Sequence, residues 1–335
     1  MILVTGGTGL VGAHLLYHLV QEHSKVRATH RKQSNLEAVK QVFSYYTETP
    51  ETHFHKIEWV EVNITRIPEL TEAFEGITHV YHCAAFVSFN PKHFQALKKA
   101  NVEGTANVVN LCIAKGIQKL CYVSSVATLG MPENSPFISE ETPWNPEDQN
   151  SVYSITKYGA EMEVWRGSQE GLNVVIVNPG VILGEGFWHS SSGVIIKRAA
   201  RGIRHYTSGS SGFVDVRDVV TIMIQFMNSS ITQERFVVVA ENLSYQKLLT
   251  LLAKAFGNPP PTKKISKRVL LFLSSTDWFF SKFFGRKRSL LKATVRSLFT
   301  HSSYDASKIK ETLSVDFIPM EKTMDRIAKA YKNHS

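Results

Sequence analysis

The first twelve residues read MILVTGGTGLVG and contain the pattern that decides the fold. An apolar run of strand length, Ile2–Thr5, leads into glycines, and a helical pattern follows over Val11–Glu22. At this spacing Gly6 permits a tight turn, Gly9 lets backbone N–H groups approach a pyrophosphate, and Gly12 lets the helix lie close to the sheet. The phosphate would lie at the positive N-terminus of that helix. The stretch therefore predicts a dinucleotide-binding strand–turn–helix.

Short apolar runs alternate with helical patterns through the first half of the chain, which indicates an α/β fold with a parallel sheet. The expected strands are Ile2–Thr5, Lys25–Thr29, Ile57–Val62, His79–His82, Lys119–Ser124, Asn173–Val177 and Phe236–Val239. The expected helices are Val11–Glu22, Leu36–Tyr46, Pro68–Phe74, Phe94–Lys115, Tyr153–Glu170 and Gln246–Phe256. We predict a doubly wound Rossmann domain with helices on both faces over 1–178. A smaller, mostly helical substrate-binding region should follow over 179–335, with about 213–240 returning to the sheet.

Two later segments depart from this alternation. From Gly180 to Arg217 the chain is rich in Gly and Ser, as in Ser190–Gly193 and Ser208–Gly212, and we expect loops over a site. Val269–Phe284 is apolar but is interrupted by Ser274–Asp277, so it is too short and too polar to span a bilayer. We predict a pair of short helices packed on the catalytic domain, covering an apolar substrate pocket. The alternative is a helix on a membrane surface.

The composition is that of a globular protein, with 43% hydrophobic and 20% charged residues. The net charge of +9 is concentrated between Lys263 and Lys310, where the local excess is +10. We interpret this excess as a basic enzyme surface rather than a nucleic-acid interface. No His or Cys spacing typical of a metal site occurs, so we expect no metal. Three scattered cysteines and the lack of a secretory signal favour the cytoplasm.

The end of the second expected strand predicts the dinucleotide. An acidic residue there would accept hydrogen bonds from the 2′-hydroxyl of NAD. From Lys25 onward, however, the sequence contains no carboxylate until Glu37. Arg31 can instead hold a 2′-phosphate through paired hydrogen bonds. The sequence therefore favours NADP over NAD.

Tyr153 and Lys157 lie four residues apart on one face of a predicted helix. A phenol with its ordinary pKa of about 10 is a poor acid–base group at neutral pH. A neighbouring ammonium and a positively charged nicotinamide both favour the phenolate, so we expect the pKa of Tyr153 to fall. Tyr153 could then give a proton to a carbonyl, or take one from an alcohol, as hydride moves. We interpret Glu161 and Glu163, on the same helix, as a solvated face or a helix-packing pair.

The chain resembles the extended short-chain dehydrogenases/reductases from its first residue to about Asp218. The matching stretches are the TGGTGLVG turn, His82–Ala85, Asn101–Thr105, Val123–Ser125, the Tyr153/Lys157 pair, Asn178–Gly180 and Phe213–Asp218. Within that family, Val26–Arg31 and Tyr304–Lys308 are similar to the dihydroflavonol-reductase and 3β-hydroxysteroid-dehydrogenase type of branch. Three positions depart from the family pattern. Asn63 stands where many members have an adenine-contacting aspartate, Asn178 stands where sugar-nucleotide enzymes usually have Arg, and Glu311–Ser314 replaces a Glu-Leu-Gly common near the end.

The resemblance implies roles for the matching residues. Ser125 would hold the substrate oxygen, with Ser124 the less favoured candidate. Lys157 would also bind the nicotinamide ribose, and Asn101 would kink its helix and support a proton relay through water. The implied cofactor-binding residues are Gly6, Thr8, Gly9, Leu10, Val11, Gly12, Arg31, Asn63, Ile64, Cys83, Ala84, Ala85, Val123, Tyr153, Lys157, Pro179, Gly180, Val181 and Ile182. The expected substrate-binding residues are Phe86, Ser88, Ser125, Val126 and Phe187. The resemblance also implies a homodimer formed through helices near 94–115 and 153–170.

These features favour an NADP(H)-dependent oxidoreductase that reduces a carbonyl, or oxidises an alcohol, of an apolar small molecule. The apolar character of the substrate is suggested by Phe86, Phe89, Phe187, Trp188 and the 269–284 segment. One alternative is a nucleoside-diphosphate-sugar epimerase or dehydratase. Its diphosphate could be held by Arg217 and the basic C-terminal residues, although Arg31 argues against the NAD that such enzymes keep. A second alternative is a non-catalytic NADP-binding sensor, which would not need Ser125, Tyr153 and Lys157 together.

Overall fold

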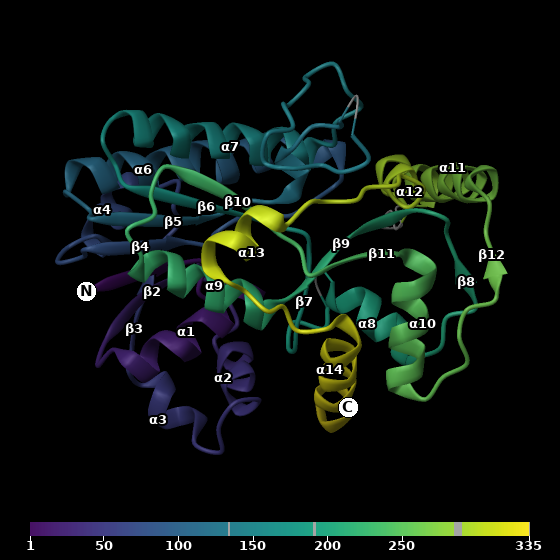
Figure 1. The fold of residues 1–335 in the computed structure, drawn as a ribbon, viewed down its shortest axis with the longest axis horizontal. Coiled ribbons are helices and arrows are strands. Elements are labelled where there is room, and N and C mark those ends of the chain that lie inside the picture. The colour runs from purple at the N-terminus through teal and green to yellow at the C-terminus, as the bar shows by residue number, and fades with distance from the viewer. Residues whose placement is uncertain (133–134, 190–191, 285–289, 335) are drawn as a thin grey trace.

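The main element of the fold is a twisted parallel sheet (Figure 1). The computed structural model describes residues 1–132, 135–189, 192–284 and 290–334, and over 279–284 it describes the backbone alone. The described residues form seven parallel strands in the order β10–β6–β5–β4–β1–β2–β3. Their bounds are β1 Ile2–Thr5, β2 Val26–His30, β3 Ile57–Glu61, β4 His79–His82, β5 Lys119–Val123, β6 Val174–Pro179 and β10 Glu234–Val238. The strand order reverses between β1 and β4, and dinucleotides bind beyond the carboxyl ends of strands at such a point.

Helices cover both faces of this sheet (Figure 1). One face carries α1 Leu10–Glu22, α2 Glu37–Ser44, α3 Pro50–Phe54 and α9 Val216–Asn228, and the other carries α4 Ile67–Ala73, α6 Gly104–Ala114 and α7 Val152–Gln169. Successive strand residues point to opposite faces, so Val4 and Val175 enter one core while Leu3 and Val174 enter the other. The predicted doubly wound Rossmann fold is confirmed.

A second lobe is built around a three-stranded sheet of β7 Val181–Leu183, β9 Ser210–Asp215 and β11 Glu241–Ser244. A separate apolar core joins this sheet to α8 Gly193–Ala200, α10 Tyr245–Phe256 and α14 Met320–His334. Beyond them β8 His205–Tyr206 pairs with β12 Lys263–Lys264, and α11 Lys267–Phe284 lies beside α12 Lys292–Ser297 (Figure 1). The chain then returns through α13 Ser307–Leu313 to the edge strand β10.

The prediction of loops between Gly180 and Arg217 is wrong for much of that range, because β7, α8 and β9 lie within it. Two of its glycines serve close packing rather than loop flexibility. A Cβ on Gly180 would lie 2.5 Å from the carbonyl oxygen of Gly212, and one on Gly212 would lie 2.8 Å from Val239. Ser190 and Ser191 of the expected loop lie outside the described residues.

Two helix predictions also need correction. The expected helix Phe94–Lys115 consists of α5 Phe94–Leu97, a π-helical stretch Lys98–Glu103, and α6. The expected pair of helices in Val269–Phe284 is wrong, because α11 is continuous. Its polar residues do not end the helix: Ser275 and Thr276 donate to the carbonyls of Leu271 and Leu273, at 3.0 and 2.9 Å. None of the described helices combines the length and apolar character that crossing a membrane requires.

Candidate active site

The glycine turn between β1 and α1 has the shape of a phosphate cradle. Gly6 adopts φ +71°, and a Cβ there would lie 2.7 Å from the backbone of Ala84. A Cβ on Gly12 would lie 2.2 Å from the Gly6 carbonyl oxygen. The first i→i−4 bond of α1 runs from Ala13 N to Gly9 O at 2.9 Å, so the three intervening amides precede the helix ladder. These residues fit a pyrophosphate, which such amides and the helix dipole would bind.

Arg31 lies in a loop that folds against this turn. The Ser34 hydroxyl accepts hydrogen bonds from the Arg31 amide at 3.0 Å and from the Thr8 hydroxyl at 3.2 Å. The Arg31 side chain is exposed, and its guanidinium has no hydrogen-bond or ion-pair partner among the described residues. Arg27 on β2 differs, because it is paired with Glu58 at 2.9 Å. Arg31 is therefore a cation beside the glycine turn with no competing carboxylate.

Asn101 joins the loop after β4 to the first turn of α7. Its buried side chain accepts from the Phe86 amide at 2.7 Å and donates to the Phe86 carbonyl at 3.0 Å and to Thr156 Oγ1 at 3.2 Å. Thr156 in turn donates to the carbonyl of Tyr153 at 3.1 Å. Asn101 lies within the π-helical stretch, which interrupts the α-helix predicted over 94–115.

Ser125 and Tyr153 come together where β5 ends and α7 begins. Ser125 caps a short 3₁₀ helix, its hydroxyl accepting from the Ala127 amide at 3.1 Å. Ser151 caps α7 by accepting from the Ser154 amide at 3.0 Å, which fixes the position of Tyr153. Burial raises the pKa of Tyr153, while a hydrogen bond with the Ser125 hydroxyl acts to lower it. The pair presents two hydroxyls at the carboxyl end of the sheet.

In the chain alone burial raises the pKa of Tyr153, and the fall expected beside a bound nicotinamide stays a prediction. Lys157 is buried, and its ammonium donates to the Tyr122 hydroxyl at 2.5 Å and to the Val123 carbonyl at 2.9 Å. Burial lowers the pKa of Lys157 to about 7, against the opposing charge of Glu161. In the chain alone the Lys157 ammonium is therefore bound to the Tyr122 hydroxyl and the Val123 carbonyl.

A chain of buried polar groups connects β1 to Lys157. Thr5 Oγ1 lies 2.6 Å from His82 Nδ1, and His82 Nε2 lies 2.9 Å from Thr105 Oγ1. The His82 ring stacks on Tyr122 with centroids 5.3 Å apart, and Tyr122 receives the Lys157 ammonium. Burial lowers the pKa of His82 to about 3, so the imidazole is neutral at physiological pH. These contacts hold Lys157 at the carboxyl ends of the central strands.

Glu161 is the main residue of the candidate site that sequence reasoning missed. It is fully buried, so its interpretation as part of a solvated face is wrong. Its carboxylate accepts from the hydroxyls of Ser124 and Thr128 at 2.5 and 2.7 Å, from Asn178 Nδ2 at 2.9 Å, and from Arg235 at 3.0 Å. These bonds hold the turn that carries Ser125. The spacing 153, 157 and 161 marks one helix face and could have identified it.

The other predicted residues lie around these groups. Pro179 ends β6, and the Gly180 amide donates to the Val238 carbonyl at 3.1 Å, where Val181 and Ile182 begin β7. Asn63 is exposed and forms a turn by accepting from Thr65 at 3.0 and 3.2 Å. Ile64 covers Gly104, whose Cβ would lie 2.7 Å from it. The Cys83 amide continues the β1–β4 pairing by donating to the Thr5 carbonyl at 3.1 Å, and Ala84 and Ala85 follow.

The aromatic residues expected near the substrate are divided between two places. The ring centroids of Phe89 and Tyr153 lie 5.4 Å apart. Phe86 stacks on the His93 ring, and His93 Nδ1 is also hydrogen-bonded to Ser88 Oγ at 2.8 Å. Val126 is buried beside Ser125, and Phe187 is partly buried between β7 and α8 with φ +37°. The use of Trp188 as substrate surface is wrong, because it is buried in the second lobe against Tyr331, at 5.1 Å.

Comparison with known proteins agrees with this geometry. Residues 2–240 match the family model described as the NAD dependent epimerase/dehydratase family. A putative dihydroflavonol 4-reductase of Synechocystis sp. is 27% identical, over 99% of this chain and 94% of its own length. Sterol demethylase protein B of Methylococcus capsulatus is 31% identical, over 80% of this chain and 78% of its own length.

A solved structure adds the fold. The Bordetella bronchiseptica enzyme WbmG, in complex with NAD and UDP, superposes with a TM-score of 0.75 at 18% identity, covering 99% of this chain and 94% of that one. At this identity the likeness concerns the fold alone. From the glycine turn, the strand order and the family match over 2–240, the chain belongs to the NAD dependent epimerase/dehydratase family of extended short-chain dehydrogenases/reductases.

Proposed function

We propose that the chain is an NADP(H)-dependent oxidoreductase acting on a carbonyl or alcohol group of an apolar small molecule. The observation that carries the proposal is the grouping of Ser125, Tyr153 and Lys157 beyond the carboxyl ends of the sheet that bears the glycine cradle. Two relatives are named a putative dihydroflavonol 4-reductase and a sterol demethylase protein, and both names refer to apolar ring compounds as substrates. Phe89, in edge contact with Tyr153, provides an apolar surface for such a substrate.

The proposed mechanism assigns each step to a group of this chain. The bound dinucleotide supplies or accepts the hydride. Ser125 Oγ donates a hydrogen bond to the substrate oxygen and so holds the carbonyl beside Tyr153. Tyr153 Oη gives its proton to that oxygen as the carbonyl is reduced, or takes the proton from an alcohol in the reverse direction. Lys157, whose pKa is lowered to about 7 by burial, can hold or release a proton near neutral pH.

The epimerase or dehydratase alternative loses part of its basis. A nucleotide-sugar substrate needs free cations to hold its diphosphate. Arg217 was one candidate, beside the basic C-terminal residues, and it pairs with the buried Glu185 at 2.8 Å and lies over the Tyr46 ring at 4.5 Å. Arg217 therefore already has a carboxylate partner within the fold, and we favour the apolar substrate.

The reaction class can be tested by following the absorbance of reduced nicotinamide. Purified protein is mixed with NADPH and a panel of apolar aldehydes, ketones and steroid-like compounds. It is separately mixed with UDP- and TDP-sugars, whose products are analysed by chromatography because an epimerase or dehydratase returns the hydride and consumes no NADPH. We expect NADPH to be consumed with members of the apolar panel only. Turnover of nucleotide sugars alone would overturn the proposal.

The proposed preference for NADP rests on Arg31. Replacing it with Ala is expected to weaken NADPH binding by roughly 10- to 100-fold, the size of a lost hydrogen bond to a charged group, and to leave NADH binding little changed. Titration of both cofactors by fluorescence measures this. Lys32→Ala is the control, because Lys32 is an adjacent exposed cation. Tighter binding of NADH than of NADPH to the unaltered protein would contradict the assignment.

A further inference from the structure

The outer surface of α11 and α12 exposes apolar side chains next to cations. Among the described residues, the exposed large hydrophobics of α11 are Trp278, at 47%, and Val269, Phe272 and Leu273, at 49, 68 and 43%. Spacing of i, i+3 and i+4 places the last three on one side of the helix. The other side of α11 faces α12, where Ser274 is buried and donates to the Leu290 carbonyl at 2.9 Å. The apolar stripe therefore faces away from the protein.

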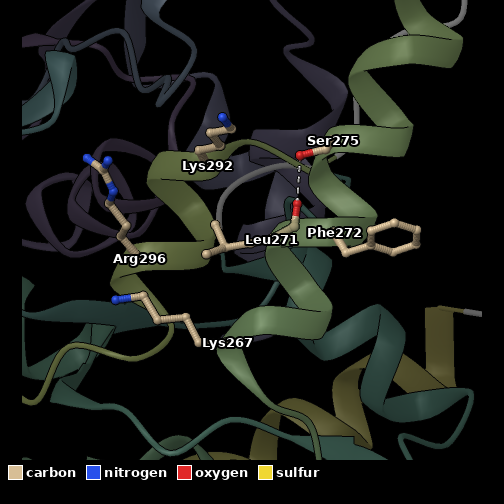
Figure 2. A pocket seen from close by; sticks show the side chains of 6 residues that line it. All are labelled: Lys267, Leu271, Phe272, Ser275, Lys292 and Arg296. Carbon is tan, nitrogen blue, oxygen red and sulfur yellow. Dashed lines mark hydrogen bonds between the residues drawn. The ribbon is translucent and has the colours of Figure 1, made fainter.

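Three cations lie on the α12 side of α11, across the helix from Phe272 (Figure 2). A hollow of about 350 Å³ is lined by Lys267, Leu271, Phe272 and Ser275 of α11 and by Lys292 and Arg296 of α12. Figure 2 shows Leu271 on the side of the three cations and Phe272 on the other side of α11. None of these three cations has a carboxylate partner among the described residues. The hollow is thus lined by apolar side chains and by cations.

The single acidic residue in the sequence of α11, Asp277, offsets one of these charges and leaves an excess of positive charge. Asp277 Oδ2 accepts a hydrogen bond from the Leu290 amide at 2.9 Å, so it is engaged at the junction with α12. Arg268, next to the stripe, is exposed and adds a further cation. We call the set of Lys267, Arg268, Val269, Phe272, Leu273, Lys292 and Arg296 the α11–α12 surface.

We propose that the α11–α12 surface docks on an anionic membrane. Aliphatic and aromatic side chains such as Leu273 and Phe272 enter the boundary between headgroups and acyl chains, while Lys and Arg attract anionic headgroups. A nucleic acid would use the cations but would leave an aliphatic stripe without a partner. The earlier preference for helices that cover a substrate pocket is replaced, because the apolar stripe is exposed rather than packed. In this arrangement the second lobe would face the bilayer that holds apolar substrates.

Vesicle sedimentation tests the proposal on the full chain. One set of vesicles is phosphatidylcholine alone, and in the other a third of the lipid is phosphatidylglycerol. We expect the protein to sediment with the anionic vesicles, and the triple variant K267Q/K292Q/R296Q to bind them roughly a hundredfold more weakly. F272D should also lose binding. The matched control K247Q/K322Q/K329Q removes three exposed cations of α10 and α14 and should bind almost as the unaltered protein does.

The same experiment distinguishes an anionic membrane from other ligands that could bind the α11–α12 surface. Failure of the unaltered protein to sediment with anionic vesicles overturns the proposal. Binding that is lost in phosphate buffer but not in chloride of equal ionic strength would indicate a phosphate site, and equal binding by F272D would indicate charge alone. A dimer that F272D converts to a monomer, without vesicle binding, would assign the surface to a second copy of the chain. Circular dichroism confirms that each variant is folded.

Discussion

Replacing Tyr153 with Phe is expected to lower kcat for NADPH-dependent carbonyl reduction by roughly 10²- to 10⁴-fold, the usual contribution of a positioned general acid. The substitution removes one oxygen atom and keeps the ring that contacts Phe89 at 5.4 Å. Ser151 still caps α7, and Asn101 still holds its first turn through Thr156. The cofactor dissociation constant should therefore change little, and the loss should appear in kcat.

Tyr158→Phe is the matched control for this experiment. Tyr158 lies on the same helix and stacks on Trp144 with centroids 4.5 Å apart, away from Ser125. Its replacement should leave kcat almost unchanged. Full activity in Tyr153→Phe would place the proton donor elsewhere, whereas NADPH binding without turnover in the unaltered protein would favour the non-catalytic alternative.

The parts of the fold that local sequence determines were predictable. The glycine turn, the strand-length apolar runs and the Tyr153/Lys157 spacing each depend on residues close together in the chain. Their positions follow from backbone geometry, as the 2.7 Å approach of a Gly6 Cβ to Ala84 illustrates. The structure places strands at nearly the predicted ranges for this reason.

Other features depend on partners distant in the chain. Glu161 is buried because Ser124, Asn178 and Arg235, from three different strands or strand ends, meet its carboxylate. The helical pattern alone could not distinguish this burial from a solvated face. Likewise, the polar residues within α11 bond to carbonyls one turn earlier, and the sequence predicted a break there.

Arg217 shows the same effect for function. As a cation in a matching motif it was a reasonable ligand for a diphosphate. In the fold it is paired with Glu185, which comes from the segment after β7. Whether a charged residue is free to bind a ligand depends on which carboxylates lie within reach, and this is set by tertiary structure.

The ion cluster that includes Glu185 leads to the largest expected effect on stability. Arg326 on α14 pairs with Glu185 at 2.6 Å and with Asp215 at 2.6 Å, and both carboxylates are almost completely buried. Thr323, one turn earlier, donates to Asp215 at 2.6 Å. The C-terminal helix is thus tied to β9 and to the segment after β7. Replacing Arg326 with Leu is expected to lower the free energy of unfolding by about 3–5 kcal/mol, because the buried Asp215 loses its ion-pair partner and the buried Glu185 keeps only Arg217.

The pH dependence of this loss identifies its cause. Burial acts to raise the pKa of Glu185, but the hydrogen bond and charge of Arg326, with His14 and Arg217, hold it below its ordinary value. Without Arg326 the pKa of Glu185 should rise, so the variant's folded state retains a proton that the unfolded state releases. The difference in unfolding free energy between Arg326→Leu and the unaltered protein should therefore grow as pH rises from about 5 to 8. Urea denaturation at each pH measures it. Lys329→Leu, an exposed cation on the same helix, should show a small loss independent of pH; an equal loss there would mean that the cluster is not what stabilises α14.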